Sequence, residues 1–238
     1  MARELAIGSV RLSTRLPRIV AAGGDAELDA LVAAADADLV ELRADLFGDP
    51  RPATVVAALE RLRAAGRPVI LTVRAAAEGG RPLPDAVRRE LYRAGLAYAD
   101  AIDVEIASPL AGELVAGARA AGRTVILSAH ATDATPPADV LLPLVDRAEA
   151  MGADVTKLAA MARDLEDVRT MLAVTLAARH RGVVTVAMGP AGTLARVLLP
   201  AAGSLFTYGH VGSPTAPGQL TVRELATLVR RFFSFASS

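Results

Sequence analysis

Short apolar runs alternate with longer amphipathic segments along most of the chain. The runs are rich in Val, Ile and Leu and cover residues 18–22, 38–45, 69–75, 101–106, 124–131, 153–159, 183–188 and 205–211. Most are too short for helices, and their continuous apolar character is typical of parallel strands that are buried on both faces. The pattern therefore predicts eight β-strands.

The segments between these runs have apolar residues at helical spacing. They cover residues 25–35, 51–66, 82–99, 108–122, 136–152, 164–180, 191–203 and 221–235. Asp25 is a candidate N-cap for the first, and glycines such as Gly66 end several others. Eight strand-then-helix units in 238 residues predict a (β/α)8 barrel in a single domain over residues 1–238. A doubly wound open sheet is the alternative, because periodicity does not show whether a sheet closes.

Composition excludes several classes of protein. The chain has no cysteine, which rules out a disulfide framework and a thiolate metal site. Its formal net charge is zero, so nothing suggests a nucleic-acid or membrane surface. No apolar run is long enough for a membrane span, and the first residues lack the apolar core and cleavage site of a signal peptide. We therefore expect a cytoplasmic protein.

Polar residues interrupt the predicted strands near their carboxyl ends, where barrel enzymes place their chemistry. They are Glu41, Arg43, Asp45, Arg74, Glu78, Asp103, Glu105, Ser128, His130 and Lys157. We expect Asp45 and Asp103 to form ordinary structural ion pairs or to lie on the solvated rim. Arg43, Arg74, His130 and Lys157 should converge on one rim of the barrel, together with Glu41 and Glu78, and such a cluster of ionisable groups is typical of a catalytic site.

Lys157 is the only lysine in a chain whose other basic positions are arginine. Arginine keeps its charge, whereas lysine can lose its proton when it is desolvated. We expect burial and nearby arginines to disfavour the ammonium, since full burial can lower a lysine pKa by roughly 3–5 units. The neutral amine would form an imine with a carbonyl and acidify the adjacent C–H. The alternatives are a chance survivor of drift towards arginine and a side chain that snorkels from a strand end.

An imine of this kind needs a base, and His130 lies one predicted strand away from Lys157. Its ordinary pKa lies near working pH, and Glu78 could orient and polarise the imidazole. His180 is expected at the surface, and His210 is a lesser candidate near the rim. Arg196 matches a carboxylate in bidentate geometry, with an exposed helix residue as the alternative. The glycine-rich loops after the last two strands loosely fit a phosphate site, although glycines also simply make turns.

Several segments together resemble one family, type I 3-dehydroquinate dehydratase, over nearly the whole chain. They are VELRAD, TVRAAAEGG, IDVEI, ILSAH, ADVTKLAAM, TVAMGPAGTLAR and TYGHVGSPTAPGQ, in this order. The resemblance implies a (β/α)8 barrel and a hydro-lyase of the shikimate pathway, which leads to the aromatic amino acids. It also implies a small-molecule substrate and no metal or organic cofactor. Dimers occur in the family, which makes a homodimer an expectation.

By this resemblance, the enzyme removes water from 3-dehydroquinate by syn elimination and gives 3-dehydroshikimate. Lys157 is the imine-forming lysine, His130 the general acid and base, and Glu78 the residue that supports the histidine. The resemblance also implies that Glu41, Arg43 and Arg74 hold substrate hydroxyls and order the pocket, and that Arg196 grips the substrate carboxylate. It implies a loop hydroxyl from Thr215 or nearby Ser213, a closing-loop role for Gln219, and pocket walls from Met188 and Tyr208.

The chain departs from the family directly after the predicted base. Ala131 and Thr132 follow His130, where the family commonly has an acid or amide and then an aromatic residue. This departure could change how His130 is positioned. The alternatives are another class I Schiff-base lyase or aldolase, which would share Lys157, and a non-catalytic barrel that binds a carboxylated metabolite. The sequence leaves open the oligomeric state and the choice between a biosynthetic and a catabolic role.

Overall fold

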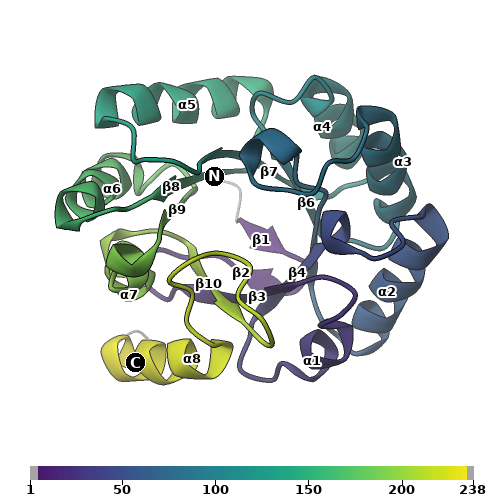
Figure 1. Ribbon diagram of the computed structural model, residues 1–238, viewed down its shortest axis with the longest axis horizontal. Helices are drawn as coiled ribbons and strands as arrows, with labels where there is room; N and C mark the ends of the chain where they lie inside the picture. The colour runs from purple at the N-terminus through teal and green to yellow at the C-terminus, as the bar shows by residue number, and fades with distance from the viewer. Residues whose placement is uncertain (1–4, 235–238) are drawn as a thin grey trace.

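The computed structural model describes residues 5–234, in which eight parallel strands form one sheet surrounded by helices (Figure 1). The strand order is β10-β3-β4-β5-β6-β7-β8-β9. The strands are β3 (Arg18–Gly23), β4 (Leu39–Arg43), β5 (Val69–Thr72), β6 (Ala101–Glu105), β7 (Thr124–Ala131), β8 (Val155–Met161), β9 (Val183–Met188) and β10 (Phe206–His210). The backbone N–H of Leu205 donates to the Val183 carbonyl at 3.0 Å, which brings β10 beside β9. The sheet is thus a nearly closed barrel, which confirms the predicted fold and excludes the open sheet.

Each predicted helical segment contains a helix that packs on the outside of the barrel (Figure 1). The helices are α1 (Leu28–Ala33), α2 (Pro52–Ala64), α3 (Asp85–Gly95), α4 (Ala111–Ala120), α5 (Ala138–Met151), α6 (Leu165–Ala178), α7 (Ala195–Ala202) and α8 (Val222–Phe232). Short 3₁₀ turns follow three strands: η1 (Ala44–Leu46), η2 (Ala76–Glu78) and η3 (Pro190–Thr193). Among the described residues, no helix has both the length and the apolar character that crossing a bilayer requires.

Helix starts follow local hydrogen-bonding chemistry, and one predicted start was wrong. The Asp164 carboxylate accepts from the backbone N–H groups of Glu166 and Asp167 and so caps α6. By contrast, α1 begins only at Leu28 and has no side-chain cap. Asp25 instead accepts from the Gly48 N–H at 2.9 Å, so it ties two loops together.

A small antiparallel hairpin of β1 (Ala6–Ile7) and β2 (Val10–Arg11) precedes the barrel and was not predicted. Ile7 is fully buried and belongs to the cluster that fills the barrel interior, with Val20, Leu39 and Ile70. The Thr124 hydroxyl donates to the Ala6 carbonyl at 2.7 Å, at the start of β7. The hairpin therefore closes the amino-terminal end of the barrel.

Polarity changes along the barrel axis because side chains alternate on each strand. Ile70, Ala101, Ile126 and Val155 fill the interior near the strand starts. Two or four residues further along the same strands, the buried residues are Thr72, Arg74, Asp103, Glu105, Ser128 and Lys157. The predicted single domain over 1–238 includes residues 1–4 and 235–238, which lie outside the described residues.

Candidate active site

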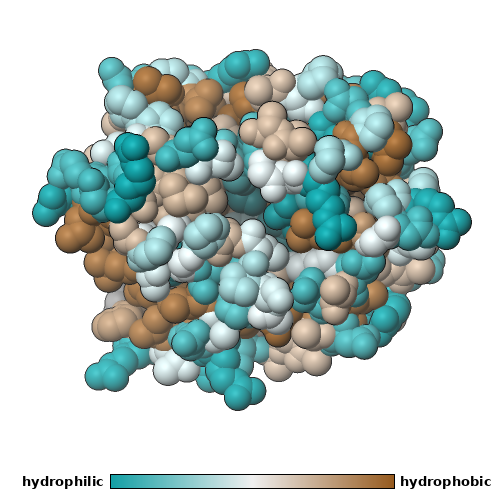
Figure 2. All heavy atoms as spheres, in the orientation of Figure 1, coloured by the Kyte–Doolittle hydropathy of each residue, from teal (hydrophilic) through white to brown (hydrophobic). Residues whose placement is uncertain are grey.

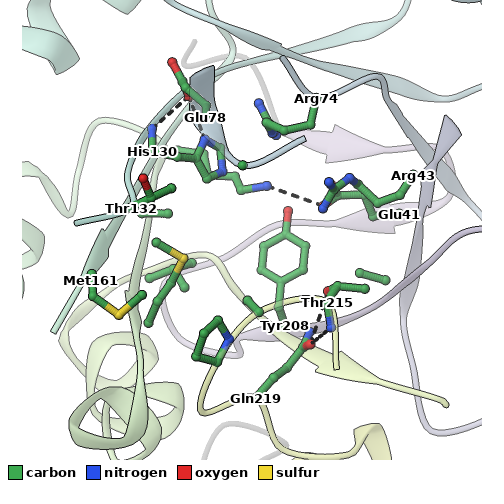
Figure 3. Close-up of a pocket in the computed structure, with 18 of the residues that line it drawn as sticks. Glu41, Arg43, Arg74, Glu78, His130, Thr132, Met161, Tyr208, Thr215 and Gln219 are labelled. Carbon is green, nitrogen blue, oxygen red and sulfur yellow. Dashed lines mark hydrogen bonds and ion pairs between the residues drawn. The ribbon is translucent and has the colours of Figure 1, made fainter. Parts of the chain in front are cut away.

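One cavity of about 250 Å³ at the carboxyl ends of the strands brings the predicted site residues together (Figure 3). Figure 2 shows this face, with a hollow near its centre bordered by hydrophilic and near-neutral residues. Apart from the alternative Ser213, the cavity is lined by the residues to which the sequence assigns a catalytic or substrate-binding role: Glu41, Arg43, Arg74, Glu78, His130, Lys157, Met188, Arg196, Tyr208, Thr215 and Gln219. Ser213, the alternative loop hydroxyl, is exposed and does not line it.

Lys157 lies deep in the barrel, with only 5% of its surface exposed. Its Nζ lies 2.7 Å from Asp103 Oδ2 and 3.4 Å from Glu41 Oε2, and 4.4 Å from the centre of the Tyr208 ring. Arg43 and Arg74 line the same cavity, but the nearest charged groups to the amine are carboxylates. The amine is buried as predicted, but two carboxylates face it.

Asp103 is central to the site, whereas the sequence assigned it an ordinary structural or surface role. Its other oxygen, Oδ1, accepts from Arg74 at 2.8 Å and from the Ser128 hydroxyl at 2.6 Å. Burial opposes its charge, but Arg74 and Lys157 outweigh burial and lower the pKa of the Asp103 carboxyl. A carboxylate on the inner face of a parallel strand was the signal that pointed to it.

The Glu78 carboxylate contacts the His130 imidazole near the carboxyl end of β7. Glu78 Oε2 lies 2.8 Å from His130 Nδ1 and accepts the His130 backbone N–H at 2.9 Å. Burial, followed by the charges of Arg74 and Lys157, lowers the pKa of His130 well below its ordinary value. Burial also raises the pKa of Glu78 to about 7. The histidine is therefore neutral near pH 7, with one ring nitrogen held by Glu78.

The glycines after Glu78 allow this carboxylate to reach the histidine. Gly79 ends the short turn η2 in the left-handed region, with φ of 86°. At Gly80, an added Cβ would lie 2.1 Å from the Arg74 carbonyl oxygen, so only glycine fits there. This close approach folds the segment back over the end of β5.

Arg43 and Arg74 are held by carboxylates on their own side of the cavity. Arg43 makes two hydrogen bonds to Asp45, of 2.8 and 2.7 Å, as expected for a structural ion pair of Asp45. Arg74 is buried and bonds to Asp103, to Glu105 and to the Ser128 hydroxyl, each at 2.8 Å. The Arg74 guanidinium therefore already has several partners within the protein.

Arg196 has no carboxylate partner among the described residues, in contrast to these two arginines. It is 3% exposed and lines the cavity from α7, so the exposed-helix alternative was wrong. Its Nε has no hydrogen-bond partner in the part of the chain that the structure describes, and its Nη2 lies 3.5 Å from the Pro217 carbonyl oxygen. Burial lowers the pKa of Arg196 to about 10. A buried cation of this kind is well suited to receive an anion.

Known proteins match this chain over most of its length. The family model of type I 3-dehydroquinase matches residues 20–234. The chain belongs to the type I 3-dehydroquinase family. A 3-dehydroquinate dehydratase of Methanocella arvoryzae is 36% identical over 210 residues, covering 88% of this chain and 94% of that protein. A 3-dehydroquinate dehydratase of Klebsiella pneumoniae is 38% identical over 205 residues, covering 80% and 81%.

Solved structures give the same result for the fold. The 3-dehydroquinate dehydratase of Geobacillus kaustophilus is similar with a TM-score of 0.87 and 28% identity, covering 97% of this chain and 98% of that one. The enzyme of the same name from Aquifex aeolicus has a TM-score of 0.81 and 29% identity, covering 90% and 98%.

In this type I 3-dehydroquinase chain, the loop between β10 and α8 covers one side of the cavity. The backbone N–H and the hydroxyl of Thr215 donate to Gln219 Oε1, at 2.8 and 3.2 Å. The Gly189 N–H donates to the Pro217 carbonyl at 3.0 Å, which joins this loop to the one after β9. The two glycine-rich loops considered for phosphate are therefore bonded to each other.

Other residues complete the wall without charge. Met161, Val186, Met188 and Tyr208 line the cavity, and Thr132 lies on the His130 side. His210 Nδ1 lies 2.6 Å from the Gly212 carbonyl oxygen, and neither His210 nor the exposed His180 lines the cavity. Among the described residues, no group of three or more His, Asp or Glu side chains is placed to hold a metal ion.

Proposed function

We propose that this chain is a 3-dehydroquinate dehydratase, a hydro-lyase that acts through an imine on Lys157. The observation that carries the proposal is the position of the only lysine of the chain. It is buried in a cavity that also holds the His130–Glu78 pair and Arg196, which has no carboxylate partner within residues 5–234. A nucleophile, a base and a site for an anion are the parts that this elimination needs.

Imine formation begins when the free Lys157 amine adds to the substrate ketone and the ketone oxygen leaves as water. The amine has to lose the proton that it shares with the facing carboxylates. Glu41 and Asp103 both lie within reach of the amine as proton acceptors. The resulting iminium withdraws electrons from C2 and makes its proton acidic.

His130 then moves the protons of the elimination. Because Glu78 accepts Nδ1–H, the other ring nitrogen, Nε2, is free to take the C2 proton. The electron pair left on C2 forms the new double bond as the C1–O bond breaks. The imidazolium returns its proton to the departing oxygen, so water leaves on the same face. Hydrolysis of the imine releases 3-dehydroshikimate and the free lysine.

The substrate carboxylate is assigned to Arg196, because its guanidinium is the cavity cation that lacks a carboxylate partner in the described chain. Glu41 and Arg43 are assigned to substrate hydroxyls. Of the two roles that the resemblance implies for Arg74, we assign the ordering of the pocket, because its Nη1 and Nη2 are already bonded to Asp103, Glu105 and Ser128. Arg74 orders the pocket by holding Asp103 against Lys157.

A class I aldolase acting on a sugar phosphate is the nearest rival function. The Gly189 N–H, in one of the loops considered for phosphate, is already bonded to Pro217. A single arginine balances the one negative charge of a carboxylate but leaves a phosphate dianion with excess charge. Geometry and charge therefore favour the dehydratase.

Turnover measured by ultraviolet absorbance tests the proposal, since the product contains a conjugated enone. We expect absorbance to rise with 3-dehydroquinate and no reaction with sugar phosphates. The matched variant Lys157→Arg keeps a cation beside Asp103 but cannot form an imine, so it should fold and give no product. Turnover of a sugar phosphate, or binding of 3-dehydroquinate without turnover by the unaltered protein, would contradict the proposal.

The homodimer, the absence of a nucleic-acid partner and the cytoplasmic location are also proposed. The formal net charge of zero supports the second of these. Light scattering on the purified protein tests the homodimer directly, and we expect twice the chain mass of 24.6 kDa.

A further inference from the structure

A chain of buried charges leads from the catalytic lysine out through the barrel wall to helix α3. Arg88 on α3 is 3% exposed. Its Nη2 donates to Glu105 Oε2, its Nη1 to Asp85 at 2.8 Å and its Nε to the Val73 carbonyl at 3.1 Å. An arginine between a helix and a sheet is costly to bury unless its charge is paired, and here Glu105 and Asp85 pair it.

Arg88 contacts the barrel where the pairing between β5 and β6 stops. The register of β5 and β6 ends at the pair Thr72 and Asp103. Beyond that pair, side chains of α3 replace the ladder bonds. The Tyr92 hydroxyl accepts the Val73 N–H at 2.9 Å and donates to the Asp103 carbonyl, while Arg88 bonds to the Val73 carbonyl and to Glu105.

Charges of opposite sign alternate from this gap to the lysine. Glu105 is held by Arg88 through Oε2 and by Arg74 through Oε1. Arg74 in turn bonds to Asp103, and Asp103 Oδ2 lies 2.7 Å from Lys157 Nζ. With Arg88 in place, Glu105 is neutralised from outside the barrel, and Arg74 remains available to Asp103.

We propose that Arg88 is a positioning residue that sets the pH at which Lys157 becomes a free amine. The inference rests on the proposed role of Lys157 as the imine-forming residue. Without the Arg88 charge, Glu105 competes with Asp103 for Arg74, and the network gains one net negative charge. Both changes favour the ammonium over the amine. Arg88 thus keeps the lysine reactive, although it does not line the cavity.

Other ionisable groups also face Lys157 and are left unchanged by the test. They are Glu41 and Arg43 on β4, Arg74 just after β5, Asp103 on β6, His130 on β7 and Tyr208 on β10. Glu78 and Arg196 share the same cavity. On α3, the groups beside Arg88 are Asp85 and Tyr92.

The experiment uses the fact that Lys157 is the only lysine. Reductive methylation with formaldehyde and cyanoborohydride, followed by peptide mass spectrometry, measures how much free amine is present at each pH. A lysine-containing reference peptide in the same tube corrects for the reagent. In Arg88→Gln, we expect the midpoint of labelling to move to higher pH by roughly half to one unit, which lowers labelling about 3- to 10-fold below the midpoint.

Two further variants separate charge from loss of structure. Tyr92→Phe removes hydrogen bonds from the same gap without changing charge. Its labelling midpoint should therefore stay within about 0.2 pH units of that of the unaltered protein. Glu105→Gln removes the negative charge and should move the midpoint to lower pH. If Arg88→Gln does not fold, the sign of the Glu105→Gln shift decides.

An unchanged midpoint in folded Arg88→Gln, or in Glu105→Gln, would overturn the inference. An equal shift in Tyr92→Phe would also overturn it, because the effect would then be structural. Labelling does not require turnover, so this result is separate from the proposed function. If the unaltered enzyme fails to process 3-dehydroquinate while the shifts occur, the proposed function fails and the charge network stands.

Discussion

The two sides of the cavity are built differently. On the side formed by β4 to β8, Arg43, Arg74 and Lys157 each face a carboxylate within 3.4 Å. On the side formed by α7 and the loop before α8, Arg196 has no such partner among residues 5–234. The first side is ordered by the protein alone, which is how enzymes avoid reorganising charges during reaction. The second side is left to be completed by the substrate anion.

Removing a cation from the paired side should have the largest effect on stability. Arg74→Met leaves Asp103 and Glu105 without their shared partner. We expect the free energy of unfolding to fall by about 3–5 kcal/mol, the usual loss when one member of a buried ion pair is removed. Urea denaturation followed by circular dichroism measures it. A loss below about 1 kcal/mol, as for exposed pairs, would show that the paired side is not ordered by these charges.

Removing the cation from the unpaired side should have the opposite effect on stability. Arg196→Met removes a buried charge without leaving a carboxylate behind, and we expect stabilisation by about 1–2 kcal/mol. The same change should raise KM about 10- to 100-fold, because a charged hydrogen-bonding group is lost to the substrate. Arg169→Met, an exposed arginine on α6, is the control and should change neither quantity. Destabilisation by Arg196→Met would contradict the comparison.

Glu78 should control the acid side of the pH profile. Burial raises its pKa to about 7, so the carboxylate that accepts His130 Nδ1–H is present above that pH and is lost below it. The kcat should therefore fall as pH decreases through about 7. Glu78→Gln should lose this step and run about tenfold slower at pH 8, because a neutral amide stabilises the imidazolium less. If kcat of Glu78→Gln still falls as pH decreases through about 7, the titrating group is not Glu78.

The smallest effect is expected at the loop. Thr215→Ala removes a hydroxyl that lines the cavity and donates to Gln219, and KM should rise about 3- to 10-fold, the range of one hydrogen bond. Ser213 is exposed and serves as the matched control, since Ser213→Ala should leave KM within about twofold. Steady-state kinetics on both variants measures this. A larger effect at Ser213 would place the loop hydroxyl there.

Much of the fold was predictable because strand and helix periods differ. All eight strands were found as apolar runs, since strands covered on both faces have no polar side. The β1–β2 hairpin was missed because two-residue strands carry no periodic signal. The start of α1 was misplaced because Asp25 bonds to Gly48, a contact made only by the folded chain.

The sequence predicted which residues line the cavity. It did not predict which of them form ion pairs with one another. Polar residues on inner strand positions identified the cavity. The sequence did not show that Asp103 would hold Lys157, because Arg74 and Ser128 are the groups that fix Asp103 there. Nor did it single out Arg88, since an arginine in an amphipathic helix is usually exposed. Both assignments depend on contacts between elements far apart in sequence.

The central claim is that Lys157 forms an imine with 3-dehydroquinate. Mass spectrometry of the intact protein after incubation with this compound and borohydride tests it most directly, with the modified peptide then mapped. We predict one covalent adduct on Lys157, which persists in His130→Ala and is absent in Lys157→Arg. An enzyme that turns over 3-dehydroquinate but gives no adduct, or an adduct at any other position, would contradict the account.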